Sequence, residues 1–181
     1  MKKNQGNFTA IIAIILLTIG VFSRLVAHPA NFVPVGALAF FAGIYLPRKY
    51  AYSLPLAMMF VSDLIIGFYS PMIMASVYIG FLLMTAIGQI VRNNKKFSTI
   101  LAGVLSGSLL FFLITNAAVW AFGTMYTHNL SGLAQSYLMA IPFFRNSLMA
   151  DGFYSAIFIG AMEAVIRFKK IPVEVDVIRN S

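Results

Sequence analysis

The chain contains no cysteine among its 181 residues, which excludes disulfide bonds and thiolate metal sites. Charged residues are scarce, at 10% of the sequence compared with about 25% in a typical soluble domain. His28 and His128 are isolated, so zinc-binding spacing is missing. No glycine-rich phosphate-binding loop is present, so the chain does not supply its own ATP hydrolysis. These absences, together with 60% hydrophobic residues, indicate an integral membrane protein.

Six apolar stretches predict an all-α membrane bundle that forms a single domain over residues 1–181. The expected spans cover about 8–25, 32–46, 52–69, 71–91, 97–122 and 147–168. The second span is short: fifteen residues of helix cover about 22 Å, whereas the hydrocarbon core is about 30 Å thick. It is therefore expected to begin below the outer surface, with a recess above it. Residues 130–141 show helical spacing that ends at Pro142, which predicts a separate amphipathic helix on the outer face.

Basic residues occur in four groups that alternate with loops almost free of Lys and Arg. The groups are the N-terminus, Arg48/Lys49, Arg92/Lys95/Lys96 and Arg167/Lys169/Lys170. Because basic loops stay in the cytoplasm, both termini are predicted to be cytoplasmic. The N-terminal span could also be a signal peptide, but Arg24 and His28 stand where small cleavage-site residues should be. The net charge of +8 is assigned to topology and anionic lipid, and no nucleic-acid partner is expected.

Only three acidic residues lie within the expected spans. Glu163 precedes Arg167 by four residues, so we expect a helical ion pair with a structural role. Asp63 and Asp151 have no cation within four residues and are expected at similar depth near the outer surface. A charge at that depth is costly and usually paired or functional. The candidate partners are Arg24 and Arg145, the two basic residues outside the cytoplasmic groups.

Nine polar or aromatic residues are expected in the outer leaflet. They are Arg24, His28, Asn31, Asp63, Asn116, Trp120, Arg145, Asn146 and Asp151. Tyr69, Tyr126, Tyr137, Phe143 and Phe144 surround them. Two interpretations remain open: an outward-facing pocket for a small-molecule solute, or a structural network of ion pairs with an interfacial aromatic belt. If these residues form a pocket, its two arginines and two aspartates would make it nearly neutral, which suits a zwitterionic or uncharged solute.

Small residues recur on two spans, and they also allow two interpretations. Gly36, Ala39 and Gly43 mark the second span, and Gly103 and Gly107 mark the fifth. Such patterns let helices approach closely. They indicate either packing inside the bundle or a docking face for another membrane subunit.

Four motifs support a family resemblance that extends over nearly the whole chain. HPANFVPVGA (28–37), SDLIIG (62–67), NAAVW (116–120) and PFFRN (142–146) followed by Asp151 resemble the signatures of a bacterial membrane-protein family of unknown function. That family in turn resembles the substrate-binding S components of energy-coupling-factor (ECF) transporters. The resemblance implies a six-helix protein that captures a vitamin or similar micronutrient from outside. It also implies a transmembrane coupling subunit and two cytoplasmic ATPases as partners.

The sequence therefore predicts a solute-binding component of a micronutrient transporter in a bacterial cytoplasmic membrane, without cofactor, metal or enzymatic activity. One alternative is a structural or assembly protein whose polar cluster only holds the bundle. Another is an intramembrane enzyme that uses Asp63 and Asp151.

Overall fold

A computed structural model describes residues 2–169 and the side chains of residues 11–168, and this part of the chain is helical without any strand. The six helices are α1 (Lys2–Leu25), α2 (Val35–Tyr45), α3 (Arg48–Ile66), α4 (Pro71–Val91), α5 (Phe97–Phe122) and α6 (Leu130–Lys169). Helices α3 to α6 are long and apolar enough to cross a membrane. The all-α prediction is confirmed. Lys170, the last residue of the fourth basic group, lies outside the described residues.

Local signals explain where the helices begin and end. Helices α4 and α5 occupy the predicted residues, and Pro71 stands at the first position of α4, where a helix tolerates proline. Helix α3 lies three to four residues earlier than predicted. It starts directly after Pro47 and ends at Ile66, and the next residue, Gly67, has a φ of 107°, a left-handed conformation that favours glycine.

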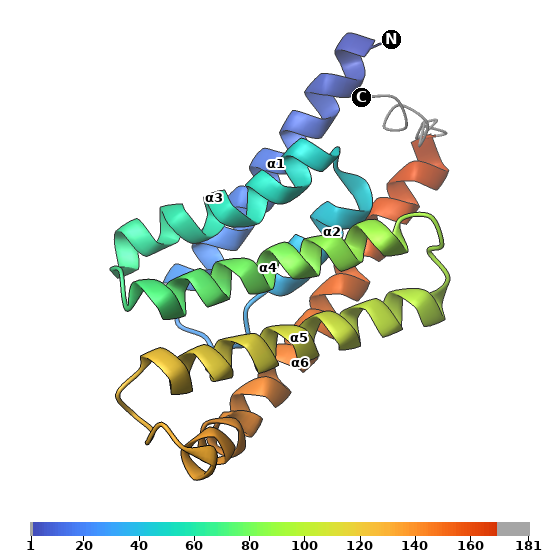
Figure 1. Cartoon of the computed structure of the whole chain (residues 1–181). Helices are drawn as coiled ribbons and strands as arrows, with labels where there is room; N and C mark the ends of the chain where they lie inside the picture. Colours follow the sequence, from blue (N-terminus) through green and yellow to red (C-terminus); the bar gives the residue numbers. More distant parts are fainter. Residues whose placement is uncertain (1, 170–181) are drawn as a thin grey trace.

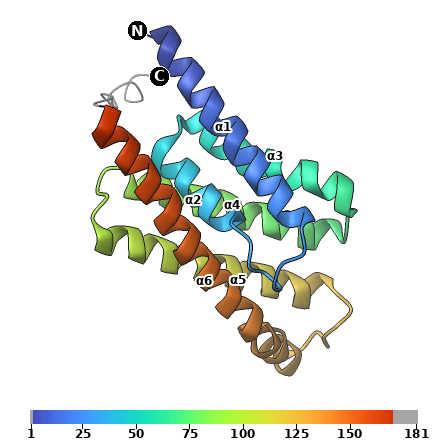
Figure 2. The ribbon, with the colours of Figure 1, turned by 180° about the vertical axis from the view of Figure 1, so that it is seen from behind.

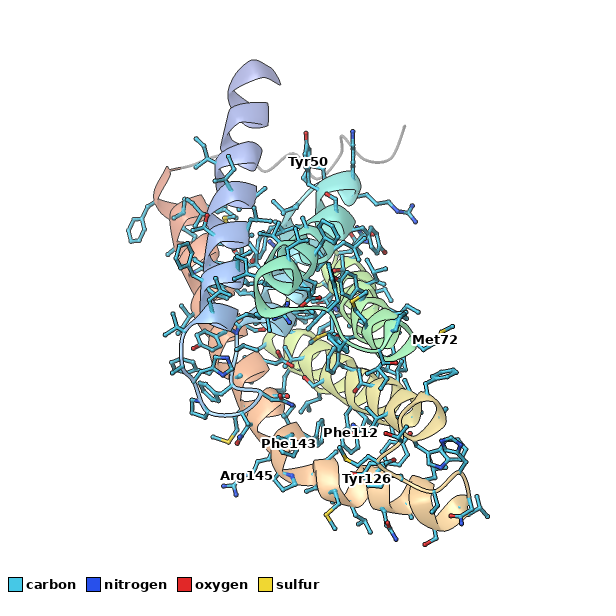
Figure 3. All side chains as sticks on the ribbon, turned by 90° about the vertical axis from the view of Figure 1, so that its left-hand side faces the viewer. Tyr50, Met72, Phe112, Tyr126, Phe143 and Arg145 are labelled. Atoms are coloured by element: carbon cyan, nitrogen blue, oxygen red, sulfur yellow. The ribbon has the colours of Figure 1, made fainter. Side chains whose placement is uncertain are left out.

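Helix α6 differs most from the prediction. Residues 130–141 are not a separate helix, because α6 continues through Pro142 for 40 residues. Figure 3 shows that α6 bends where Phe143 and Arg145 are labelled. A proline inside a helix removes one backbone hydrogen bond and bends the axis without necessarily ending the helix. The predicted amphipathic stretch is therefore the first arm of a bent helix.

Helix α2 is the centre of the bundle. It packs against all five other helices, and Figures 1 and 2 show it enclosed between α4 and α6. Every residue from Val35 to Ile44 is buried. Eleven residues cover only about 16 Å. The second helix is short, as predicted, and the surrounding helices extend beyond it.

Glycines bring the backbones of α2 and α4 into contact. A Cβ atom added to Gly43 would lie 2.2 Å from the carbonyl oxygen of Thr85, and one added to Gly88 would lie 2.3 Å from that of Phe40. A Cβ atom on Gly103 would meet the ring of Phe40 at 2.9 Å. These small residues therefore serve packing inside the bundle, the first of the two interpretations.

The C-terminal end of α2 is held by Arg92. Its guanidinium donates hydrogen bonds to the carbonyl oxygens of Ile44 at 3.0 Å and Gly43 at 2.9 Å, and to that of Leu46. These carbonyls have no partner inside α2 because they belong to its last turn. A residue expected to serve topology thus also caps the central helix.

The connections lie at two opposite ends of the bundle. The start of α1, the α2–α3 and α4–α5 connections and the end of α6 lie at one end, and the other three connections lie at the opposite end (Figures 1 and 2). The basic end therefore holds Arg48, Arg92 and Arg167. Glu163, near this end, contacts Lys95 at 2.7 Å and accepts a hydrogen bond from Tyr45 at 2.6 Å. The expected pairing of Glu163 with Arg167 is wrong, because the α4–α5 connection brings Lys95 to the same carboxylate.

Candidate functional site

Two adjoining cavities lie near the end of the bundle opposite the basic end. The larger, of about 290 Å³, receives side chains from all six helices. The smaller, of about 140 Å³, lies between α5 and α6. They share Asn31, Phe111, Thr115, Ser147 and Asp151, so the two cavities lie next to each other.

The short α2 explains why the larger cavity exists. Val35 and Gly36, the first residues of α2, line it, so the space lies where the longer neighbours extend beyond this helix. This position agrees with the recess predicted from the length of the second span. The preceding loop carries Asn31 at φ 60°, a left-handed conformation that asparagine tolerates better than most residues. That turn places Asn31 against both cavities.

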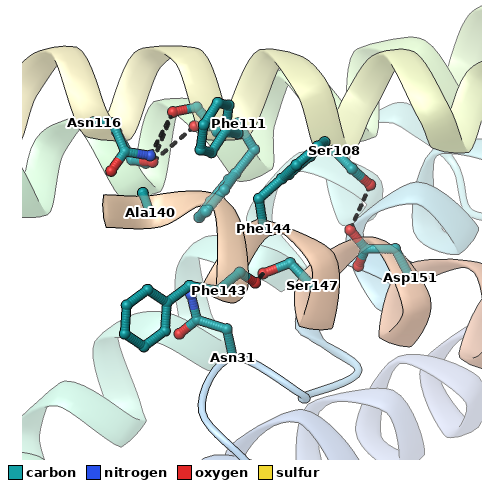
Figure 4. A pocket seen from close by; sticks show the side chains of 11 residues that line it. Asn31, Ser108, Phe111, Asn116, Ala140, Phe143, Phe144, Ser147 and Asp151 are labelled. Carbon is teal, nitrogen blue, oxygen red and sulfur yellow. Dashed lines mark hydrogen bonds between the residues drawn. The ribbon is translucent and has the colours of Figure 1, made fainter. Parts of the chain in front are cut away.

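Asp151 is the most deeply buried polar group that lines both cavities. Its side chain is 6% exposed, and Oδ2 accepts a hydrogen bond from the hydroxyl of Ser108 at 2.7 Å (Figure 4). A Cβ atom on Gly36 would lie 2.3 Å from Oδ1, so only glycine permits this approach. Asp151 therefore lies against the N-terminal end of α2, where backbone amides favour a negative charge.

Asp151 does not pair with arginine. Neither of the two salt bridges found among the described side chains includes it. The predicted partner Arg145 is exposed and points away from the bundle at the bend of α6 (Figure 3). Because α6 is continuous, Arg145 lies about 9 Å along the axis from Asp151 and about 120° around it. This pairing is wrong for that reason.

Asp63 has the partner that the sequence predicted. Its Oδ1 lies 2.8 Å from Nη2 of Arg24, and its Oδ2 accepts a hydrogen bond from the hydroxyl of Tyr78 at 2.8 Å. The Arg24 N–H groups are not aligned with Oδ1, so the contact is an ion pair without a well-directed hydrogen bond. Nη1 of Arg24 binds the hydroxyl of Ser62 and the carbonyl of Met59. The positive charge of Arg24 is thus balanced.

The two aspartates lie at different depths, contrary to the prediction. Asp63 binds Tyr78, whereas Asp151 lies near Met84, six residues or about 9 Å further along α4. Counting from residue 147 underestimated the depth of Asp151, because α6 begins at Leu130 and enters the bundle after a bend. The two carboxylates share no hydrogen-bond partner among the described residues.

Aromatic rings form the wall of the smaller cavity. Phe111, Phe112, Phe143 and Phe144 line it, and the rings of Phe112 and Phe144 lie 4.6 Å apart. Asn116 closes the end opposite Asp151 (Figure 4). Its amide nitrogen donates to the carbonyl of Phe112 at 2.8 Å. An apolar wall with a polar group at either end is the usual composition of a small-molecule site.

Five of the nine predicted site residues do not line either cavity: His28, Asp63, Trp120, Arg145 and Asn146. His28 is exposed. The indole of Trp120 donates to the carbonyl of Thr127 at 3.0 Å, and the amide of Asn146 donates to the carbonyl of Ala30 at 2.9 Å. Arg24, Asn31, Asn116 and Asp151 do line the cavities, and Asp63 lies behind Arg24.

The prediction missed Ser108, Thr115 and Ser147, which contribute the aliphatic hydroxyl groups of the site. Small hydroxyl residues are common in membrane helices, so their type alone gives no signal. Ser108 directly follows Gly107 on the buried face of α5, and this position was the available indication.

Tyr69 completes the larger cavity from the α3–α4 connection. Burial raises the pKa of its phenol, the negative charge of Asp63 raises it further, and Arg24 opposes the shift. The phenol therefore stays protonated. No group of three or more His, Asp or Glu residues with metal-binding geometry occurs in the part of the chain that the structure describes.

The sequence model of a family of unknown function, DUF6580, matches residues 2–174. The chain belongs to this family. The DUF6580 match includes all six helices and thus both cavities. No curated protein and no solved structure matches the chain.

Proposed function

We propose that this DUF6580 protein is the solute-binding component of a vitamin-like micronutrient transporter in a bacterial cytoplasmic membrane. In this proposal the chain crosses the membrane six times with both termini in the cytoplasm. The solute enters from the extracytoplasmic side. The observation that carries the proposal is the pair of adjoining cavities above α2, both of which the buried Asp151 lines.

The size and lining of the site support this proposal. Small-molecule sites have volumes of roughly 300–1,000 Å³ and combine apolar walls with a few orienting polar groups. The two adjoining cavities together reach the lower part of that range. The phenylalanines supply the apolar wall, and Asn31, Asn116 and Asp151 supply orientation. The loops that reach the cavities are poor in Lys and Arg, which favours an outward-facing entrance.

The chain has no phosphate-binding loop, so it does not supply ATP hydrolysis itself. We propose a transmembrane coupling subunit and cytoplasmic ATPases, as in the energy-coupling-factor systems. The basic end of the bundle is the side that these ATPases would approach.

A structural role is the second candidate, and the Arg24–Asp63 pair favours it for one part of the cluster. The charges of Arg24 and Asp63 balance each other, and Tyr78 donates a further hydrogen bond to Asp63. Of these three residues, only Arg24 lines the larger cavity. An enzymatic dyad is less favoured by the geometry, because Asp63 and Asp151 bind different residues at different depths. Neither alternative accounts for the space above α2.

Native mass spectrometry of the purified chain tests the proposal. We expect a co-purified small molecule on the wild-type protein. Ser147 lines both cavities, so Ser147→Phe should fill the site and remove that mass. Ala156→Phe on the same helix is the matched control, because Ala156 is exposed and lines neither cavity.

Two results would contradict the proposal. One is a wild-type protein that carries no small molecule and gains no thermal stability with any compound of a vitamin library. The other is a bound molecule that survives Ser147→Phe as well as Ala156→Phe, because that molecule would lie outside the cavities.

A further inference from the structure

We infer that the solute carries a protonated amine next to an aromatic ring, with the Asp151 carboxylate as the counter-ion of the amine. This inference rests on the proposed function and adds the chemical class of the solute. It is carried by the charges that line the two cavities.

Arg24 and Asp151 are the only formally charged side chains in the cavity lining. Arg24 is already neutralised by Asp63 at 2.8 Å. Asp151 has no such partner among the described side chains. The site therefore contains one carboxyl group without an opposite charge, rather than the balance of two arginines and two aspartates that the sequence suggested. Arg145, the missing cation, lies outside the cavities.

The surroundings of Asp151 leave room for one more interaction. Ser108 donates to Oδ2 and the backbone amide of Ala37 also lies against the carboxylate, but both donors are neutral and no described cation forms a salt bridge with it. A carboxylate that is 6% exposed in an apolar bundle is costly without an opposite charge. An ammonium group supplies both the charge and N–H donors, and charge-assisted hydrogen bonds are among the strongest in proteins.

Aromatic rings line the same cavities as this carboxylate. Phe111 lines both cavities together with Asp151, and its ring packs against Phe81 at 4.8 Å. Phenylalanine faces attract a cation and also stack on a flat apolar ring. A solute with an amine close to an aromatic ring would use both features at once.

An anionic solute does not fit the same lining. Nη2 of Arg24 is held by Asp63, and Nη1 is held by Ser62 and Met59. A carboxylate or phosphate would have to break this arrangement. It would also bring a second negative charge close to Asp151.

Three probes of similar size and different charge test the inference: benzylamine, benzyl alcohol and benzoate. Thermal unfolding of the purified full chain in detergent is measured with each probe at neutral pH, and a ligand that binds the folded state raises the melting temperature. We expect benzylamine to give the largest increase and benzoate none. Asp151→Asn keeps the shape and an acceptor for Ser108. This substitution should weaken the binding of benzylamine at least tenfold and leave the binding of benzyl alcohol unchanged.

Glu163→Gln is the matched control, because it removes a carboxylate at the opposite end of the bundle and should keep the preference for benzylamine. Where Asp151→Asn does not fold, the order of the three probes on the wild-type protein decides the question. Sodium chloride alone is included because an inorganic cation could also neutralise Asp151.

The outcomes separate this inference from the proposed function. If benzyl alcohol or benzoate binds as well as benzylamine, the site binds solutes but the inference that the solute carries an amine is wrong. If sodium ions alone stabilise the protein and Asp151→Asn removes the effect, the counter-ion is inorganic and the inference is overturned. If no probe binds and no molecule co-purifies, both the inference and the proposed function fail.

Discussion

Asp63 shows how the bundle accommodates a charge in an apolar environment. The carboxylate is 1% exposed, and one guanidinium and one phenol contact it. Removing one partner from such a buried pair leaves the other charge without compensation, and this loss costs more than the intact pair contributes.

We predict that Asp63→Asn and Arg24→Gln each lower the free energy of unfolding by about 3–5 kcal/mol. The double variant should lose less than the sum, because the uncompensated charge is absent from it. The measurement is reversible unfolding in mixed micelles. Arg145→Gln is the control and should change stability by less than about 0.5 kcal/mol, because Arg145 is exposed. Strict additivity of the two single changes would contradict the pairing.

For Trp120 we predict only a small loss of stability, in contrast to the Arg24–Asp63 pair. Its indole binds the Thr127 carbonyl at 3.0 Å in the α5–α6 connection and does not line a cavity. We therefore expect Trp120→Phe to cost about 1 kcal/mol, the value of one hydrogen bond, and to leave solute-induced stabilisation in place. Phe111→Ala, at a shared cavity wall, should abolish that stabilisation. Thermal unfolding with the co-purified solute measures both, and loss of binding in Trp120→Phe alone would show that the site extends to the connection.

Among the helices, α2 has a charged side chain at each end. Asp151 lies at its N-terminal end and Arg92 binds the carbonyls of its C-terminal end. A helix carries partial positive charge at its N-terminus and partial negative charge at its C-terminus, so both contacts have the favourable sign. The two groups also satisfy backbone atoms that lipid could not.

The contact between α2 and α4 depends on the absence of side chains. We predict that Gly43→Ala destabilises the bundle by about 1–3 kcal/mol, because the new methyl group would overlap the backbone of Thr85. Gly160→Ala in α6 is the control, because no atom lies within 4 Å of a Cβ at that position. Alanine is also the better helix former, so this change should be neutral or slightly stabilising. Equal losses for the two variants would show that Gly43 does not determine the approach.

The sequence was most informative where residues that start or end helices agreed with the hydrophobic pattern. Helices α4 and α5 were predicted to the residue, since Pro71 and the basic loop at Arg92–Lys96 delimit them. Pro142 was misleading, because a proline bends an interior helix as readily as it ends one. The Arg24–Asp63 pair could be predicted because few cations were available. The partner of Asp151 could not, because it is a serine on a helix 43 residues away.

On the scale of the whole molecule, the basic residues of the described chain gather at one end, except Arg24 and Arg145. We predict that reporters inserted at Lys49 and Lys95 lie in the cytoplasm and one inserted at His128 lies outside. An alkaline phosphatase and fluorescent protein fusion pair measures each position from both sides. A cytoplasmic signal at His128 would invert the entrance of the cavities and contradict uptake from outside.

The enclosed position of α2 has a consequence for how the chain is made. Eleven residues are too few to span the hydrocarbon core of about 30 Å alone, so α2 cannot settle in lipid when it leaves the ribosome. The helices that pack around α2 include α4, α5 and finally α6. Asp151 of α6, which contacts the start of α2 at Gly36, follows Gly36 by more than 110 residues in the sequence. With the proposed six-span topology, we therefore expect insertion of the second segment to finish only after the last helix has been synthesised. In a chain truncated before α6, α2 would lack the contacts that α6 provides.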